Sequence, residues 1–357
     1  MKNKDINNLV IGLMSGTSLD GLDIALCEFK EYLGAFSFKI IAAKTITYDE
    51  DWKKKLSNAQ HLSAIQYFET HTKYGRFIAN EINQFLNALS IKPNAIASHG
   101  HTVFHQPALG FTNQLGCGAS IAALTGLNTV CDFRSKDVSL AGQGAPLVPI
   151  GDKLLFGEYD ACLNIGGIAN ISYDNKNGDR IAYDLCVANM LLNYLAEKKG
   201  FLFDKGGEMA KSGLVDDLLL NQLNALEYYK QTGAKSIGRE WFENNILNFF
   251  DTKEKEVINL LATATEHIAT VIASELNNNK IKNVLLTGGG TFNSFLIERI
   301  KSKTNSILVI PSVDLINFKE AIIFAFLGYL RLNQITNTLK TVTGANKDSI
   351  GGAVYLG

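Results

Sequence analysis

Two stretches of the sequence, one in each half, repeat the same order of features. In each, an apolar run meets a polar turn containing glycine and is followed by two further runs rich in β-branched and aromatic residues. The first stretch covers residues 9–48 and the second covers residues 161–185. Runs of this kind around short polar turns predict β-hairpins. Because the pattern recurs, although without residue identity, we expect a duplicated α/β unit.

Helix-like segments separate the predicted strands, so the fold class is α/β. Helices are predicted within 51–89, 117–125, 189–199, 213–226, 253–277 and 319–332, and further strands at 95–98, 129–133, 282–286 and 307–310. Residues 135–149 contain two Gly and two Pro and are expected to be a loop. With 357 residues the chain suits about two domains. We place their boundary near 134, giving an N-terminal lobe of 1–134, rejoined by the last C-terminal residues, and a C-terminal lobe of 135–357.

Composition argues against several classes of protein. The formal net charge is −1 and no long basic tract occurs, so neither nucleic acid nor an anionic membrane is an expected partner. The five cysteines include no CxxC pair, which fits neither a disulfide framework nor a zinc site. The N-terminus does not resemble a signal peptide, and no apolar run approaches the ~20 residues of a membrane span. We therefore expect a cytoplasmic protein with reduced thiols.

The first glycine turn, Gly12 to Asp23, is dense in small polar residues. A bound phosphate needs converging backbone N–H groups, and glycine lets the backbone approach it. Thr17 and Ser18 add hydroxyl donors, and Asp20 and Asp23 could position water bound to Mg²⁺. An ordinary hairpin turn also favours these residue types, so both interpretations remain open here.

Two more glycine turns follow. Asn164 to Ile171 places Gly166 and Gly167 between two strands, with Asn164 and Asn170 as polar residues in apolar strands. These amides are either paired core groups or part of a polyphosphate site. Gly288, Gly289 and Gly290 join a strand to a helix, where free N–H groups favour anions. The sequence has neither a GxGxxG in a first βαβ unit nor a GxxxxGK[ST] motif, which disfavours a Rossmann dinucleotide site and a P-loop.

Asp184 is the candidate general base. It is predicted at the end of a strand, where carboxylates face clefts in open α/β sheets, although it could instead cap the helix that follows. Polar residues also cluster on predicted loops, as suits a polyhydroxyl or carboxylate ligand. They are Ser98, His99, Gly100, His101, Thr102, His105, Asp132, Arg134 and Gln143. The three histidines lack a zincin spacing, so metal ligation is the minor alternative.

Together these segments resemble the anhydro-N-acetylmuramic acid kinases. The shared motifs stand here as GLMSGTSLDGLD, ASHGHTVFHQP, DFRSKDVSLAGQGAPLVP, LNIGGIANIS, SIGREWF, GGGTFN and TGANKDSIGGAVYLG. They occur in order from residue 12 to the C-terminus, so the resemblance covers nearly the whole chain. The first motif and GQGAPLVP are the most specific of them.

The resemblance implies two actin-like (ribonuclease H-like) lobes around a central ATP cleft. It implies that ATP and Mg²⁺ are bound by Gly16, Thr17, Ser18, Leu19, Asp20, Gly21, Leu22, Asp23, Gly166, Gly167, Asn170, Gly288, Gly289, Gly290 and Asn293. It implies that Asp184 activates the water that opens the 1,6-anhydro ring while O6 takes the γ-phosphoryl group. The sugar would contact Ser98, His99, Gly100, His101, Thr102, Asp132, Arg134, Gln143 and Asn189. A cytoplasmic homodimer in peptidoglycan recycling is implied in the same way.

The chain departs from the family pattern at two places. Where the family reads DTGPGN or DTGPAN, this chain reads Asp184-Leu185-Cys186-Val187-Ala188-Asn189, which changes the expected turn. Where the family has Gln after His-Gly, this chain has His101. Two alternatives therefore stay open: a different sugar kinase of the same superfamily, and a nucleotide-binding regulator without catalysis.

Overall fold

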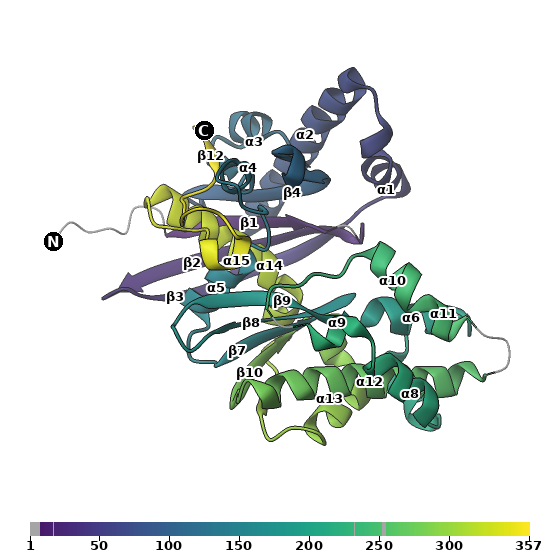
Figure 1. Ribbon diagram of the computed structural model, residues 1–357. Coiled ribbons are helices and arrows are strands. Elements are labelled where there is room, and N and C mark those ends of the chain that lie inside the picture. Colours follow the sequence, from purple (N-terminus) through teal and green to yellow (C-terminus); the bar gives the residue numbers. More distant parts are fainter. Residues whose placement is uncertain (1–7, 17, 232, 252–254) are drawn as a thin grey trace. The chain divides into compact units, whose positions relative to one another are not determined.

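The computed structural model describes residues 8–16, 18–231, 233–251 and 255–357, and the chain forms two compact units (Figure 1). Unit 1 contains the residues up to 155 together with 318–357, and unit 2 contains 156–317. The division therefore falls later than the expected boundary near 134. Helices α4 (Ser135–Ser139) and α5 (Val148–Leu155) stay with unit 1. Thr343 Oγ1 donates to Asp137 Oδ1 over 2.8 Å, and Lys319 Nζ lies 2.8 Å from Asp152 Oδ1.

Unit 1 is built on a seven-stranded mixed sheet. Its strands are β1 (Leu9–Ser15), β2 (Gly21–Tyr32), β3 (Ala35–Thr47), β4 (Ala95–Gln106), β5 (Phe111–Leu115), β6 (Asn128–Cys131) and β12 (Ala353–Tyr355). The order is β12-β6-β4-β1-β2-β3, and β5 pairs with β4. β2 is antiparallel to both β1 and β3, whereas β4 is parallel to both β1 and β6.

Helices cover both faces of this sheet, which explains why β1 is apolar at nearly every residue. Ile11 and Leu13 pack in one cluster with Tyr74 and Ile78 of α2 (Ala64–Leu89). On the other face, a Cβ at Gly12 would lie 1.8 Å from the carbonyl oxygen of Ala321 in α14 (Val313–Leu332). The remaining helices of the unit are α1 (Glu50–Ser57), α3 (Gly118–Thr125) and α15 (Lys340–Thr343), with short 3₁₀ turns at 59–61 and 107–109.

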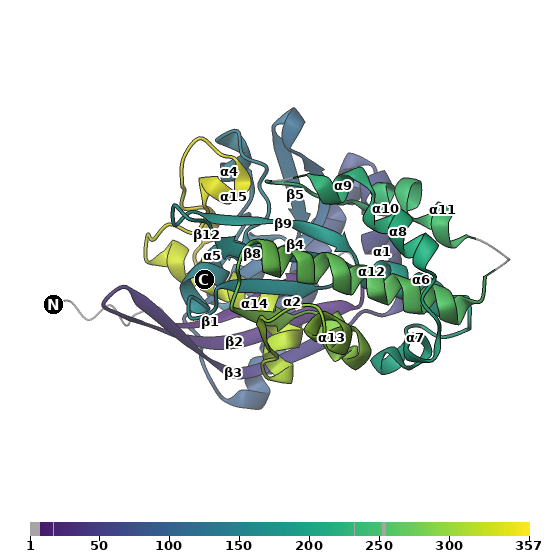
Figure 2. The same ribbon diagram turned by 60° about the horizontal axis from the view of Figure 1, so that its bottom comes forward.

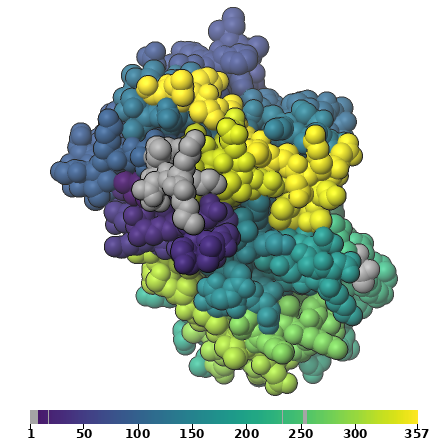
Figure 3. All heavy atoms as spheres, turned by 90° about the vertical axis from the view of Figure 1, so that its left-hand side faces the viewer, coloured from purple at the N-terminus to yellow at the C-terminus, as the bar shows by residue number. Residues whose placement is uncertain are grey.

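The C-terminal segment completes unit 1. β12 pairs antiparallel with β6, so Tyr355 lies opposite Thr129. In Figure 3 the yellow C-terminal residues accordingly lie against blue residues from the first third of the chain.

Unit 2 repeats the strand order of unit 1. Its strands are β7 (Ala161–Ile165), β8 (Ile168–Asp174), β9 (Arg180–Val187), β10 (Asn283–Thr287) and β11 (Ile307–Val309), in the order β11-β10-β7-β8-β9. The first three strands are again antiparallel, and β10 is parallel to β7 and β11. β9-β8-β7-β10-β11 therefore matches β3-β2-β1-β4-β6 in order and direction. The expected α/β class with two actin-like lobes is confirmed.

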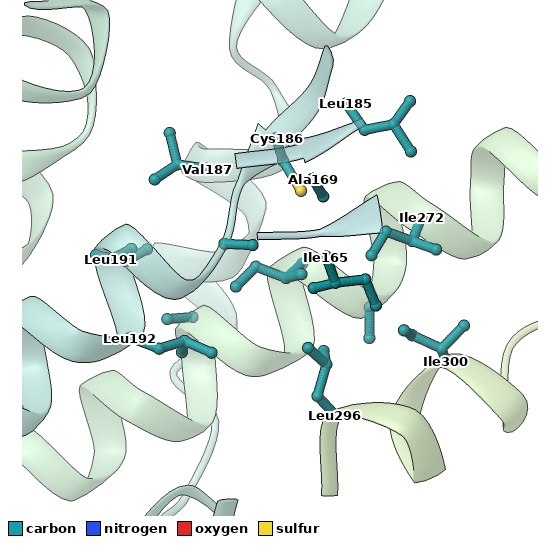
Figure 4. Packing of buried hydrophobic residues seen from close by; sticks show 14 of the residues in the cluster. Ile165, Ala169, Leu185, Cys186, Val187, Leu191, Leu192, Ile272, Leu296 and Ile300 are labelled. Carbon is teal, nitrogen blue, oxygen red and sulfur yellow. The ribbon is translucent and has the colours of Figure 1, made fainter. Parts of the chain in front are cut away.

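The core of unit 2 lies between its sheet and helices α6 (Asn189–Glu197), α12 (Val257–Asn278) and α13 (Ser294–Lys301) (Figure 2). Figure 4 shows Ile165, Ile272 and Leu296 meeting in this cluster. α12 is long and apolar enough to cross a membrane by length and composition alone, but 67% of its apolar window is buried inside the protein. The other helices are α7 (Glu208–Ser212), α8 (Asp217–Asn224), α9 (Glu227–Lys230), α10 (Arg239–Asn245) and α11 (Leu247–Phe250), with 3₁₀ turns at 205–207 and 289–292.

Two local expectations are corrected. The strand expected at 95–98 continues to Gln106, because the histidine-containing segment pairs with β5. The expected loop 135–149 contains α4 and the start of α5. The five cysteines form no disulfide with one another, and Cys27, Cys162 and Cys186 are buried.

Candidate active site

A row of polar side chains crosses the sheet of unit 2. Thr287 of β10 lies beside Asn164 of β7, which lies beside Asn170 of β8, which lies beside Asp184 of β9. The residues that alternate with them in the sequence, such as Leu163, belong to the core cluster on the other face. Thr287 was missed by the sequence reasoning, although it directly precedes the three glycines. Its buried Oγ1 has no hydrogen-bond partner among the described residues.

A β-bulge aims Asp184 at this row. Asn170 pairs with Asp184, but the preceding residue Ala169 pairs with Cys186, so Leu185 is an extra residue in β9. Bulges next to active sites re-aim side chains. Asp184 was expected at the end of its strand, but β9 continues to Val187, because Cys186 and Val187 pair with Ala169 and Ile168 of β8.

The carboxylate of Asp184 is held by the segment 235–237 and does not cap a helix. Its Oδ2 accepts hydrogen bonds from Ser236 Oγ (3.0 Å) and from the backbone N–H of Ile237 (2.9 Å). Its own backbone N–H donates to the carbonyl oxygen of Lys235 (3.1 Å). Burial raises the pKa of Asp184, and the hydrogen bonds from Ile237 and Ser236 oppose that rise. The N-cap of α6 is Ala188, so the alternative role of Asp184 as a helix cap does not hold.

Tyr228 and Tyr183 hold Asp184 and the segment 235–237 in place. The Tyr228 hydroxyl donates to the carbonyl oxygen of Asp184 (2.8 Å). Lys235 Nζ lies 4.8 Å from the ring centroid of Tyr228 and 5.9 Å from that of Tyr183, as in cation–π contacts. Sequence reasoning missed Tyr228, since a tyrosine in a helix of four residues carries no signal of its own. Ser236 was noticed only as the start of the SIGREWF motif.

The glycine turns of unit 2 lie next to this row. Gly288 has φ +83°, and a Cβ there would lie 2.6 Å from Asn164 Oδ1, so only glycine fits. The carbonyl oxygens of Gly166 and Gly167 accept hydrogen bonds from the N–H groups of Asn189 (3.0 Å) and Ala188 (2.8 Å). The structure thus brings together Asn164, Gly166, Gly288 and Asn189.

Two predicted asparagines near these turns have structural partners. Asn189 Nδ2 donates to the carbonyl oxygen of Ile165 over 3.2 Å. Asn293 Oδ1 caps α13 by accepting from the N–H of Leu296 over 3.0 Å. Gly289 and Gly290 lie in the 3₁₀ turn between β10 and α13. The side chains of Asn189 and Asn293 therefore shape the turns that carry the glycines.

The first glycine turn joins β1 to β2 in unit 1. Thr17 lies outside the described residues, Ser18 and Asp20 are exposed, and Leu19 has φ +60°. Gly21 and Leu22 begin β2. Asp23 lies opposite Met14 and accepts a hydrogen bond from Thr45 Oγ1 over 2.6 Å. Burial raises the pKa of Asp23, against the effect of that hydrogen bond.

His99 and Arg134 form a buried pair in unit 1. Arg134 donates from Nε (3.2 Å) and Nη2 (2.8 Å) to His99 Nε2, and from Nη1 to the carbonyl oxygen of Gly144 (2.7 Å). His99 Nδ1 lies 2.8 Å from the carbonyl oxygen of Gly100. Burial and the guanidinium hold the pKa of His99 well below its usual range, so it is neutral. Burial lowers the pKa of Arg134 to about 10.

The other residues expected near the sugar lie around this pair or on the adjacent loop. Ser98 is buried, and its Oγ has no partner in the described part of the chain. Thr102 Oγ1 accepts from Gln114 Nε2 over 3.4 Å. Asp132, with φ +52°, accepts from the N–H and Oγ of Ser135, whereas Gln143 is exposed and held through its backbone N–H. Within residues 8–16, 18–231, 233–251 and 255–357, His, Cys, Asp and Glu side chains form no group of three that could hold a metal ion.

Comparison with known proteins places these features in one family. The family model described as anhydro-N-acetylmuramic acid kinase matches residues 8–357. A protein of that name from Legionella pneumophila (strain Lens) is 36% identical over 365 residues, covering 98% of each chain. Another from Aliivibrio fischeri is 36% identical over 369 residues, covering 97% of this chain and 98% of its own. A solved (R)-2-hydroxyglutaryl-CoA dehydratase component A from Acidaminococcus fermentans has a TM-score of 0.45 at 11% identity, covering 89% of this chain and 96% of its own, a likeness too weak to bear on function. The chain belongs to the anhydro-N-acetylmuramic acid kinase family.

Proposed function

We propose that this protein is an ATP-dependent kinase that opens the ring of 1,6-anhydro-N-acetylmuramic acid with water and phosphorylates O6, giving N-acetylmuramate 6-phosphate. The observation that carries the proposal is the placement of Asp184. It is a half-buried carboxylate that a bulge sets at the end of a polar row bordered by two glycine turns. Full-length similarity to kinases named for this sugar supplies the substrate.

Asp184 acts as the general base. Both of its hydrogen bonds go to Oδ2, so Oδ1 has no partner among the described residues and can accept the proton of a water. That water forms a bond to C1, the bond from C1 to the bridging oxygen breaks, and this oxygen becomes O6. O6 then forms the bond to the γ-phosphorus as the bond to ADP breaks. The reaction consumes one water and releases one proton.

Backbone N–H groups of the glycine turns and the hydroxyl of Ser18 bind the phosphates, and Gly288 to Gly290 border the adenosine. Mg²⁺ neutralises phosphate charge when it enters with the nucleotide. The exposed carboxylate of Asp20 and that of Asp23 are the hard oxygen groups next to the first turn, which fits this ion. Arg134 and His99 contact the sugar. We extend the proposal to a cytoplasmic homodimer in peptidoglycan recycling, which sedimentation velocity and fractionation of cells would test.

Product analysis tests the proposed reaction. The protein is incubated with Mg-ATP and the anhydro sugar in ¹⁸O water, and the product is weighed at early times beside a control of product in the same water. One ¹⁸O atom at C1 of a 6-phosphate, formed without a hydrolysed intermediate, supports the coupled reaction. A phosphorylated sugar without solvent oxygen would favour a plain sugar kinase. Tight ATP binding with no phosphorylated sugar would favour a regulator.

Replacing the base tests its role. Asp184→Asn should keep ATP binding and lower kcat by about 10²–10⁴-fold, which is the usual contribution of general acid–base catalysis. Asp251→Asn is the control, since Asp251 is an exposed carboxylate of the same unit that pairs with Lys198. Calorimetric titration with ATP and initial rates of phosphorylation measure the two quantities. Normal turnover by Asp184→Asn would remove Asp184 as the base.

A further inference from the structure

A buried chain of hydroxyl groups in unit 1 ends at the imidazole of His101. The hydroxyls of Tyr74 and Tyr48 lie 2.5 Å apart, and the Tyr48 hydroxyl donates to Ser15 Oγ over 2.8 Å. Ser15 Oγ lies 3.2 Å from His101 Nδ1. All four residues are buried; Tyr74 lies in α2, Tyr48 directly follows β3, Ser15 ends β1, and His101 lies in β4. Ser15 is the last residue of β1 and belongs to the first glycine turn.

The direction of the hydrogen bonds follows from counting protons. A hydroxyl has one proton to donate. Tyr48 gives its proton to Ser15, so in their mutual bond Tyr48 accepts from Tyr74. Ser15 Oγ accepts from Tyr48, so of these two hydrogen bonds it can donate only in the one to His101 Nδ1. Leaving it unpaired would cost about 1–3 kcal/mol. Ser15 therefore donates, Nδ1 is bare, and a neutral imidazole then carries its proton on Nε2.

The two neighbouring histidines of β4 have the opposite tautomer. His99 Nδ1 must donate to the carbonyl oxygen of Gly100, because a carbonyl only accepts. Thr112 gives its proton to the carbonyl oxygen of Phe104 over 3.2 Å, so His105 Nδ1 donates to Thr112 Oγ1. Burial lowers the pKa of His101 to about 4, so this imidazole is neutral near pH 7. Its Nε2 has no hydrogen-bond partner in the described part of the chain.

We propose that the chain Tyr74–Tyr48–Ser15 fixes His101 as a neutral donor whose Nε2–H binds an uncharged acceptor oxygen of the sugar, a hydroxyl or an amide carbonyl. His101 is then a specificity-determining residue, and Ser15, Tyr48 and Tyr74 are positioning residues. The identity of the ligand rests on the proposed function, whereas the tautomer does not. A nitrogen that only donates disfavours an ammonium or N–H group at the same place on the ligand.

The tautomer is measured on the free protein with ¹⁵N-labelled histidine rings. The sequence has six histidines, and His101→Gln identifies the signals of His101. We expect a bare Nδ1 and a protonated Nε2 for His101. The ring signals should stay the same between about pH 5.5 and 8, because the imidazole of His101 stays neutral over this range. His99 is the internal control with the opposite pattern. Ser15→Ala removes the donor to Nδ1, so the Nδ1–H form should appear. An Nδ1–H tautomer in the wild type, or no change in Ser15→Ala, would overturn the proposal.

Kinetics test the contact with the sugar. His101→Gln retains an N–H donor and should keep turnover within about threefold, while His101→Leu should lose up to about tenfold in kcat/KM for the sugar, since a neutral hydrogen bond contributes about 0.5–1.5 kcal/mol. The KM for ATP should not change in either variant. Equal sugar kinetics for His101→Leu and wild type would refute the contact, and if His101→Leu does not fold, an unchanged sugar KM in Ser15→Ala refutes it. If the wild type phosphorylates no sugar, the proposed function is wrong. The ring spectra would still show whether Ser15 donates to His101 Nδ1.

Discussion

Removing the Ser236 hydroxyl should shift the pH dependence of the reaction without changing its maximum. Ser236 Oγ donates one of the two hydrogen bonds that Asp184 Oδ2 accepts. This bond favours the ionised carboxylate, because it lowers the pKa that burial raises. In Ser236→Ala the pKa of Asp184 therefore rises further. A base works in its ionised form, so the acidic limb of kcat/KM moves to higher pH.

The size of the change in the pKa of Asp184 depends on how exposed the hydrogen bond from Ser236 is. Hydrogen bonds to charged groups contribute about 1.5–3 kcal/mol. Ser236 is exposed, so water replaces part of the lost hydrogen bond. We therefore expect a net loss of about 1 kcal/mol, which is roughly a fivefold change in the ionisation equilibrium of Asp184. On the acidic limb kcat/KM should fall about fivefold, and on the plateau it should be unchanged, because there Asp184 is ionised in both proteins.

The assay is a pH profile of kcat/KM for wild type and Ser236→Ala at fixed ionic strength. Ser302→Ala is the matched control, since Ser302 is an exposed serine of unit 2 whose Oγ donates to the carbonyl oxygen of Arg299. Its profile should coincide with that of the wild type. An acidic limb that does not move in Ser236→Ala would refute the reasoning. An equal loss of kcat/KM at every pH would show that Ser236 does not act through the pKa of Asp184.

Two further predictions concern stability. Gly12→Ala should destabilise unit 1 by at least about 1–3 kcal/mol, the usual cost of overpacking, because the new Cβ would lie 1.8 Å from the backbone of α14. Urea unfolding measures this loss. Gly238→Ala is the control, since a Cβ there makes only an ordinary contact, 3.6 Å from Glu240 Oε2. Leu296→Ala should lower the free energy of unfolding by about 2–5 kcal/mol, because Leu296 is fully buried in the core cluster of unit 2 and its removal leaves a cavity. We expect a lower urea midpoint with an unchanged m-value. A loss below about 1 kcal/mol would contradict the packing.

The duplicated sheet could be predicted from sequence because the signal is local. A strand, a short polar turn and a returning strand leave their pattern within a few tens of residues, as in 9–48 and 161–185. The parallel strands β4, β6, β10 and β11 follow helices and contribute only short apolar runs. Their positions in the sheets depend on pairing between strands that are far apart in the sequence. The repeat predicts this pairing in one unit only after the strand order of the other unit is known.

The domain boundary could not be predicted in the same way. Gly142, Gly144, Pro146 and Pro149 mark a change in composition, and such residues are common in linkers. In the structure these residues instead belong to a packed part of unit 1. Gly144 N–H donates to Asp137 Oδ2 over 2.8 Å, and Asp137 also accepts from Thr343, more than 200 residues away. A contact of that sequence separation has no local signature.

The altered stretch after Asp184 was the reason to consider a regulator without catalysis. In the structure Leu185, Cys186, Val187 and Ala188 are all buried and belong to the core cluster of unit 2, and Figure 4 labels the first three of them. The turn is held through backbone groups, since the N–H groups of Ala188 and Met190 both donate to the carbonyl oxygen of Gly167. Bonds of this kind do not depend on side-chain identity. The bulge that aims Asp184 lies at Leu185, within the altered stretch, whereas Ser236 and Ile237, which donate hydrogen bonds to its carboxylate, lie outside it. The altered side chains therefore belong to the core of unit 2, and the hydrogen bonds to the carboxylate of Asp184 come from outside the altered stretch, which supports the proposed kinase over a regulator.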